Sequence, residues 1–229
     1  MHATPTPHAD FQPQITLMLA MANRLDQDAV AMLFAHRRRF RIVLSTRNLE
    51  EAASRVVGLA PDVIVLDPAI GPNAIRRVAA ALSRNDHGQL LVLDSRVHEG
   101  RLIESVRTPS TSYYTRSTSG EHLADVVRAI NARGERLFDP ALDHRVLRTP
   151  VGLQLRVDSD EPSILQLTTR ELEVMRYISL GFTVRQCADK LSLSISTIDN
   201  HKSRLMKKLR LGKSQHLTRR AIRDGLIDP

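Results

Sequence analysis

The residues best suited to chemistry lie on one face of a helix predicted for residues 196–209. At about 100° per residue, Ile198, Leu205 and Leu209 fall on one side and predict a buried stripe. The opposite side has no acidic and no large apolar residue, and it consists of Ser196, Asn200, Ser203, Arg204 and Lys207. Hydrogen-bond donors, acceptors and positive charge are what a helix in the major groove of DNA must present.

A shorter helix is predicted before this face, over residues 184–191, with a tight turn at 192–194 between the two. Thr183 is its predicted N-cap, and Thr183 and Arg185 in the first turn are placed to contact a phosphate. Thr197 adds a hydroxyl at the start of the longer helix. A short helix, a tight turn and a helix with a polar, basic outer face together predict a helix-turn-helix.

Within the outer face, Asn200 and Ser203 lie centrally, and we expect them to contact base edges. Arg204 and Lys207 flank them and are expected to contact phosphates, although arginine can also bind guanine. The alternative is a generic four-helix domain whose charged face is simply solvated.

The segment 167–228 resembles the DNA-binding domain of the LuxR/FixJ-type bacterial transcription regulators. The matching pieces are Leu167-Thr168-Thr169-Arg170-Glu171-x-Glu173-Val174, Gly181, Ala188-Asp189-x-Leu191-x-Leu193-Ser194, Thr197-Ile198-x-x-His201 and Lys208-Leu209. The resemblance implies a four-helix domain that binds double-stranded operator DNA as a homodimer. It also implies that the last helix, residues 214–224, contributes to the dimer.

The net charge of +8 is concentrated in the same segment. Residues 163–229 hold 13 Lys or Arg and 6 acidic residues, whereas residues 1–162 hold 20 Arg, no Lys and 19 acidic residues. Concentrated positive charge is typical of a nucleic-acid-binding domain. The single cysteine, Cys187, excludes an intrachain disulfide and is expected in the core, with a redox sensor as the alternative. No apolar run is long enough to span a bilayer, so a cytoplasmic protein is expected.

The N-terminal half alternates between predicted strands and helices. Its most apolar run, residues 62–66, is typical of a central strand in a parallel sheet. The strands are predicted at 15–21, 40–45, 62–66, 90–93 and 112–115, and the helices at 26–38, 49–59, 73–84, 99–106 and 120–133. This order predicts a doubly wound, five-stranded parallel α/β domain followed by the all-α helix-turn-helix domain.

Five β/α units before such a DNA-binding segment resemble the receiver domain of NarL-type response regulators. The pieces that carry the resemblance are Pro61-Asp62-Val63-Ile64-Val65-Leu66-Asp67 and Leu137-Phe138-Asp139-Pro140-Ala141-Leu142. It implies that Asp67 is the phosphoacceptor. It also implies two acidic residues after the first strand that help to hold Mg²⁺, a Thr or Ser after the fourth strand, and a Lys after the fifth.

Those switch positions depart from the family pattern. The position of the acid pair falls at about Ala20-Met21, while Asp94 stands after the fourth strand and Arg116 after the fifth. Neither Ala20 nor Met21 can hold Mg²⁺, and without a metal the charge of a forming aspartyl phosphate has little stabilisation. We therefore predict a degenerate receiver with a vestigial phosphoacceptor, no metal and no cofactor.

Arg116 can bind a carboxylate through parallel hydrogen bonds, and we hypothesise a permanent cluster of Asp67, Arg116 and Asp94. Asp26 and Asp28 come later, inside the first helix, and would have to reach back by more than a turn to replace the missing acid pair. The alternative for Asp67 is a strand-end acid that makes only a structural hydrogen bond.

Composition divides the chain into four parts: a disordered tail at 1–13, the receiver-like domain at 14–139, a linker at 140–162 and the helix-turn-helix domain at 163–229. Within the linker, the alternating stretch 152–157 either adds to a sheet edge or is simply extended. A linker of this length would allow the two domains to reorient.

Three functions remain open. The first is a sequence-specific transcription regulator that acts without Mg²⁺-dependent aspartyl phosphorylation. The second is a conventional two-component regulator phosphorylated at Asp67 by a partner kinase. The third is an interaction module controlled by a partner protein or a small ligand. An enzyme is not expected, because the sequence lacks a nucleophile–base set, a metal cluster and a phosphate-cradling glycine loop.

Overall fold

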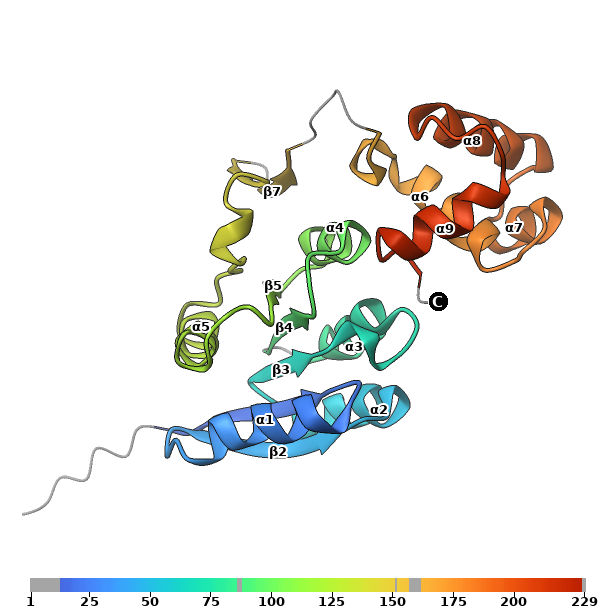
Figure 1. Ribbon diagram of the computed structural model, residues 1–229. Coiled ribbons are helices and arrows are strands. Elements are labelled where there is room, and N and C mark those ends of the chain that lie inside the picture. Colours follow the sequence, from blue (N-terminus) through green and yellow to red (C-terminus); the bar gives the residue numbers. More distant parts are fainter. Residues whose placement is uncertain (1–12, 86–87, 151, 157–161, 228–229) are drawn as a thin grey trace, which may run out of the picture.

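The computed structural model describes residues 13–85, 88–150, 152–156 and 162–227. All of the predicted tail except Pro13, and part of the predicted linker, lie outside these residues. Figure 1 shows an α/β domain followed by a helical domain that lies against one side of it. None of the helices in the described ranges combines enough length and apolar character to cross a bilayer.

A five-stranded parallel sheet forms the centre of the first domain. Its strands are β1 (Ile15–Ala20), β2 (Phe40–Thr46), β3 (Val63–Leu66), β4 (Gln89–Asp94) and β5 (Thr111–Thr115). Their order in the sheet is β2-β1-β3-β4-β5, and β3 is buried along its whole length, as its apolar sequence predicts. The connections change direction between β1 and β3, which is the topological switch point of this sheet.

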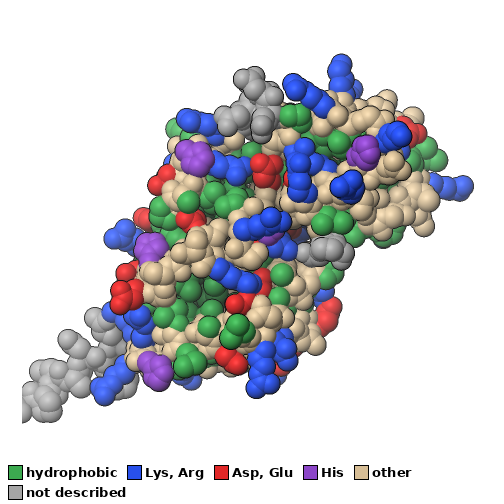
Figure 2. Space-filling view, viewed as in Figure 1, with side chains coloured by type: hydrophobic (Ala, Val, Ile, Leu, Met, Phe, Trp, Pro, Cys, Tyr) green, Lys and Arg blue, Asp and Glu red, His purple; other side chains and the backbone are tan. Residues whose placement is uncertain are grey.

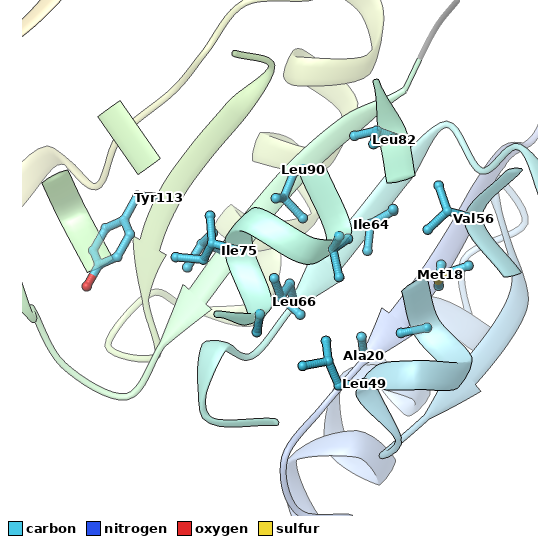
Figure 3. Close-up of a cluster of buried hydrophobic side chains, with 14 of the residues drawn as sticks. Met18, Ala20, Leu49, Val56, Ile64, Leu66, Ile75, Leu82, Leu90 and Tyr113 are labelled. Carbon is cyan, nitrogen blue, oxygen red and sulfur yellow. The ribbon is translucent and has the colours of Figure 1, made fainter. Parts of the chain in front are cut away.

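Helices cover both faces of this sheet. One face carries α1 (Arg24–Ala35) and α5 (Gly120–Arg133), and the other carries α2 (Leu49–Leu59), α3 (Ala74–Leu82) and α4 (Glu99–Arg107). Successive strand residues alternate between the two cores. Met18 and Ile64 point to the side of α2, α3 and α4 (Figure 3), whereas Leu17 and Val63 pack against α1 and α5. The predicted doubly wound α/β fold is confirmed.

Four helices form the second domain: α6 (Thr169–Ser179), α7 (Val184–Leu191), α8 (Ile195–Lys208) and α9 (Gln215–Arg223). Their inner faces enclose one core, in which Cys187, Ile198 and Leu205 are fully buried. Burial raises the pKa of the Cys187 thiol, which keeps this group protonated at neutral pH. The predicted core position of Cys187 is confirmed.

Local sequence determines where α6 and α7 begin. The Thr168 hydroxyl accepts a hydrogen bond from the Glu171 N–H at 3.2 Å, and the Glu171 carboxylate accepts one from the Thr168 N–H at 2.8 Å. Thr183 and Gln186 make the same reciprocal pair at the start of α7. Both pairs are capping boxes, which satisfy backbone N–H groups that the first turn of a helix leaves without partners.

The connection between the domains contains a short hairpin. Strand β6 (Val146–Thr149) pairs antiparallel with β7 (Gly152–Leu155), after a 3-10 turn at Pro140–Leu142. Residues 152–155 of the predicted stretch pair with β6, a neighbouring strand that the sequence pattern did not indicate, and they are not part of the five-stranded sheet. Residue 157 lies outside the described residues.

The helical domain packs against α4. The Gly100 N–H at the start of α4 donates a hydrogen bond to the Asp224 carbonyl at the end of α9, at 2.6 Å. A Cβ atom on Gly100 would lie 2.7 Å from the Leu226 nitrogen, so this approach requires glycine. Arg176 of α6 is buried in the same interface, and its Nη2 atom lies 3.6 Å from the Glu104 carboxylate of α4.

Replacing Thr168 with alanine removes the side-chain half of the α6 capping box. We expect a loss of about 1 kcal/mol in the free energy of unfolding, measured by urea denaturation followed by circular dichroism. Thr169→Ala is the matched control, because Thr169 is the exposed first residue of the helix and makes no cap. An equal loss from both substitutions would contradict the capping assignment.

Candidate nucleic-acid interface and the carboxyl edge of the sheet

The helix predicted to enter DNA is α8, and its start is fixed by a serine cap. The Ser194 hydroxyl accepts a hydrogen bond from the Thr197 N–H at 3.1 Å. Ile198, Leu205 and Leu209 are buried against the other helices of the domain. The predicted buried stripe is confirmed, and it orients the rest of the helix toward solvent.

The outer face of α8 is open. Each of its predicted members is exposed, namely Ser196, Asn200, Ser203, Arg204 and Lys207. Thr197 is half-buried instead, and its hydroxyl lies 2.7 Å from the Ser194 Oγ, so it belongs to the helix cap. Figure 2 shows Lys and Arg side chains over the part of the surface that the C-terminal helices form. The arrangement can present hydrogen-bonding groups and positive charge to a polyanion, and contact with DNA remains a prediction.

The first turn of α7 offers a second set of groups. Thr183 and Arg185 are both exposed there. The Thr183 hydroxyl lies 3.0 Å from the Gln186 side-chain oxygen and accepts from the Gln186 N–H, so it is engaged in the cap. Arg185 is therefore the better placed of the two to reach a phosphate.

Lys208 ties the end of α8 to the start of α6. Its Nζ atom lies 2.7 Å from the Glu171 carboxylate and 3.1 Å from the Gln166 carbonyl oxygen. Burial tends to raise the pKa of Glu171, but hydrogen bonds from Lys208 and Thr168 lower it below its ordinary value. The link that Lys208 makes between α8 and α6 was not predicted from the sequence. The signal was that Lys208 follows Leu205 by three residues, on the buried side of the helix.

Asp67 follows β3 at the carboxyl edge of the sheet and is fully buried. Its Oδ1 atom accepts a hydrogen bond from the Ala69 N–H at 3.0 Å. Its Oδ2 atom accepts from the Ala22 N–H at 3.1 Å and from Arg116 Nη2 at 2.5 Å. Both oxygens of this carboxylate are thus engaged by the protein itself.

Arg116 holds two carboxylates at once. Its Nη2 atom pairs with Asp67, and its Nη1 atom lies 2.5 Å from Asp26 Oδ2. The predicted Asp67–Arg116 pair is present, but the predicted inclusion of Asp94 is wrong. Asp26 was expected to lie more than a turn away from the edge of the sheet, but it lies in the first turn of α1 and reaches this edge through Arg116. The missed signal was Asn23, a helix-capping residue three positions before Asp26.

Asp94 ends β4 and has a buried cluster of its own. Arg101 Nη1 lies 2.9 Å from Oδ1, while His98 Nδ1 and the Tyr113 hydroxyl each lie 2.9 Å from Oδ2. Figure 3 shows the Tyr113 ring at the edge of the aliphatic core, with its hydroxyl oxygen directed away from that core. The sequence signal that was missed is the spacing of His98 and Arg101, four and seven residues after Asp94, at the start of a helix.

The surroundings of Asp94 favour its ionised form. Burial tends to raise the pKa of Asp94, but the hydrogen bond with His98 and the charge of Arg101 lower it below its ordinary value. Burial and the nearby Asp94 charge raise the pKa of Tyr113 well above its usual range, so its hydroxyl stays protonated and can donate.

The residues at the carboxyl end of β1 do not supply metal ligands of the kind that Mg²⁺ takes. Ala20 and Met21 are fully buried and carry no oxygen in their side chains. The two carboxylates that do meet here, Asp26 and Asp67, are both bound by the Arg116 guanidinium. Mg²⁺ requires several hard oxygen ligands in octahedral geometry, so this set does not fit it. Across the described ranges, no three His, Cys, Asp or Glu side chains gather as a possible metal site.

Comparison with known proteins identifies relatives of both domains. Residues 165–221 match the family model of the bacterial regulatory proteins of the luxR family. The chain is 27% identical to the oxygen regulatory protein NreC of Staphylococcus carnosus (strain TM300) over 183 residues, which cover 78% of this chain and 83% of NreC. It is 24% identical to NreC of Staphylococcus haemolyticus (strain JCSC1435) over 216 residues, which cover 93% and 99%.

Solved structures share the fold at lower identity. One is RcsB from Salmonella enterica serovar Typhimurium bound to the promoter rprA in the presence of the phosphomimetic BeF₃⁻, with a TM-score of 0.60, 16% identity, and coverage of 90% of this chain and 98% of that one. Another holds two RcsB dimers bound to two parallel DNAs, with a TM-score of 0.55, 16% identity, and coverage of 90% and 97%. These likenesses place the receiver-like α/β domain and the helix-turn-helix domain in one known two-domain fold.

Replacing Asp94 with asparagine tests its buried cluster. We expect a loss of about 3 kcal/mol at neutral pH, because the Arg101 charge loses its buried partner. The folded-state pKa of Asp94 is lowered, so its stabilisation is fully present above the unfolded value of about 3.9 and is lost as the pH falls through the folded value. The difference between wild type and variant should therefore narrow below about pH 4.

Urea denaturation at neutral pH and at about pH 3.5 measures both effects. Glu173→Gln is the control, because its pair with the exposed Arg170 should contribute at most about 0.5 kcal/mol. A difference for Asp94→Asn that does not change with pH would argue against an ionised Asp94.

Proposed function

We propose, from the premise that this chain carries a luxR-family regulatory domain behind a receiver-like domain, that it is a sequence-specific transcription regulator of the response-regulator type. Its target is double-stranded operator DNA, which α8 reads in the major groove. We further propose that it acts without Mg²⁺-dependent phosphorylation of Asp67. A bacterial chromosome lies in the cytoplasm, so the proposal also places the protein there.

The exposed face of α8 supports the DNA-binding part. Asn200 can accept and donate hydrogen bonds to adenine in the major groove, and Ser203 lies beside it. Arg204, Lys207 and Arg185 are exposed at the margins, where the phosphates would lie. Three of the solved structures with this fold are of RcsB bound to DNA, which is consistent with the same use of the face here.

One observation carries the phosphate-independent part: the Arg116 guanidinium binds Asp67 and Asp26 together. A positive charge that belongs to the chain already pairs with the would-be phosphoacceptor, and unlike a metal ion it cannot exchange with solvent. Asp67 is also fully buried, and both of its oxygens accept hydrogen bonds. An attack on a phosphoryl donor would have to break these contacts first, without a metal to neutralise the developing charge.

Dimerisation on DNA is part of the proposal. Two protomers related by a two-fold axis would read two half-sites, which is the usual arrangement for a helix-turn-helix. The solved structure that holds two RcsB dimers on DNA has the same fold and supports this reading. In this scheme a partner protein or a ligand, and not a kinase acting through Asp67, would change the regulator's state.

Beryllofluoride with Mg²⁺ mimics an aspartyl phosphate and tests the phosphate-independent part. We expect no change in melting temperature and no change in sedimentation when the whole protein is titrated with it, because Arg116 already occupies the Asp67 carboxylate. A conventional response regulator treated in parallel shows that the reagent is active. Stabilisation or a monomer-to-dimer shift in this protein would favour the alternative, a conventional regulator phosphorylated at Asp67.

Replacing Asn200 with alanine tests the assignment of base contacts. Selection from randomised operators should show relaxed preference at one base position, equivalent to about 1–3 kcal/mol of lost discrimination. Lys207→Ala is the matched control, since the loss of a phosphate contact should weaken all operators alike and lower the salt dependence by about one ion. Unchanged relative affinities for Asn200→Ala across operator variants would remove this residue from the base contacts.

A further inference from the structure

A pocket opens on the α1 and α5 side of the receiver-like domain, beside the Arg116 network. Its volume is about 290 Å³, and it lies between the two helices at the carboxyl edge of the sheet. Apolar side chains make most of its lining, including Met21, Val30, Leu33 and Leu123. Pockets of this kind, mainly apolar and outside the carboxyl ends of the strands, are where doubly wound domains bind small molecules. We call it the α1–α5 pocket.

One end of the α1–α5 pocket is polar and is formed by Arg116 and Asp26. The two terminal nitrogens of Arg116 are paired with Asp67 and Asp26. The third nitrogen, Nε, is buried and has no hydrogen-bond partner among the described residues. A buried donor without a partner is costly, and a ligand atom that accepts its hydrogen would gain correspondingly. The polar end therefore favours a ligand with a hydrogen-bond acceptor.

The charges at this end decide what kind of acceptor it is. Two carboxylates, Asp26 and Asp67, surround the single guanidinium of Arg116, so the ionised network carries one net negative charge. Asp67 is fully buried, and charges in the interior of a protein are screened less than charges at its surface. An anionic ligand would be repelled, whereas a neutral oxygen acceptor would accept the Nε hydrogen without that repulsion.

We propose that the α1–α5 pocket binds a small neutral molecule with an apolar body and one acceptor oxygen, such as an aromatic ketone or a quinone-like compound. The body lies against Met21, Val30 and Leu33, and the oxygen accepts from Arg116 Nε. The bound molecule contacts Arg116, which is the side chain that pairs with Asp67. Its binding would therefore change the surroundings of Asp67 directly. The existence of the site does not depend on the proposed DNA-binding function.

The probe for the test is acedan, a neutral naphthalene ketone whose emission shifts in apolar surroundings. The chain has no tryptophan, and the probe can be excited at wavelengths that tyrosine does not absorb. We expect saturable binding to the full-length protein with one site per chain. A signal that rises linearly with probe concentration, without saturation, would overturn the proposal.

Two substitutions narrow the pocket without touching the buried core. Ala29 lines the pocket and is exposed, so Ala29→Trp adds bulk at its mouth. A Cβ on Gly120 would lie 2.8 Å from the Leu33 Cδ1 atom, so Gly120→Ala displaces the flexible end of the Leu33 side chain. We expect each change to weaken acedan binding about tenfold, with melting curves confirming that both variants fold.

Matched controls separate this pocket from other apolar surface. Met32→Trp places the same indole at an exposed residue of α1 that does not line the pocket. Leu180→Trp places it in a different cavity, between the two domains. Both variants should bind acedan as the wild type does. If Leu180→Trp weakens binding and Ala29→Trp does not, the probe occupies the interdomain cavity and the proposal is wrong.

Two further measurements test whether the ligand is neutral and whether a second copy of the chain fills the α1–α5 pocket instead. The carboxylate analogue, 6-(dimethylamino)-2-naphthoic acid, should bind about tenfold more weakly than acedan, and equal or tighter binding would overturn the assignment of a neutral ligand. Sedimentation of the probe-free protein shows whether the chain forms a dimer. The protein could fail to bind acedan and form a dimer that Ala29→Trp dissociates. That result would assign the α1–α5 pocket to a second copy of the chain and overturn the proposal.

Discussion

The fork of Arg116 between Asp67 and Asp26 is the interaction on which the carboxyl edge of the sheet depends. A buried carboxylate is costly unless it is paired and hydrogen-bonded, and Asp67 is fully buried. Arg116 supplies that pairing from the loop after β5, and it also holds the first turn of α1 through Asp26. Three segments far apart in the sequence are thus held by one side chain. The charge that compensates Asp67 is therefore covalently part of the chain, and this pairing is the observation that supports the proposed phosphate-independent action.

Because Arg116 is engaged with Asp26, Asp94 is left to a separate cluster, and that cluster faces the second domain. His98 and Arg101 bind Asp94 from the start of α4. The same turn of α4 lies against the end of α9, where a Cβ on Gly225 would be 2.5 Å from the His98 Cβ. One short segment therefore contacts both the sheet edge and the helix-turn-helix domain. The His98 side chain fills the space beside Gly225, so a larger residue at position 225 would not fit without a shift of α4 or α9.

The docking of the two domains leaves the candidate DNA-binding face open. The receiver-like domain contacts α6 and the end of α9 through α4, while Asn200 and Ser203 on α8 are exposed. The cation excess of the chain is concentrated in the same C-terminal segment. Non-specific attraction to DNA is mainly electrostatic and acts over the whole basic surface, whereas the few side chains on α8 would supply specificity. In this arrangement the receiver-like domain does not cover the outer face of α8.

The sequence by itself determined the elements and the faces of the helices. Periodicity placed the five strands, the five helices of the α/β domain, and α7 and α8 close to their observed positions within the described residues, because burial of one face is a local pattern that packing then enforces. It also placed Ile198 and Leu205 inside and Asn200 outside. Only the tertiary structure decided which charges pair. Arg116 pairs with Asp26 and not with Asp94, and Lys208 pairs with Glu171. The partners lie on different elements, and the distance between them depends on where a helix begins and on how two helices cross. Sequence periodicity locates the start of a helix only to within about two residues. That uncertainty moves a side chain by several ångströms, which is too much to predict which charged groups will form an ion pair.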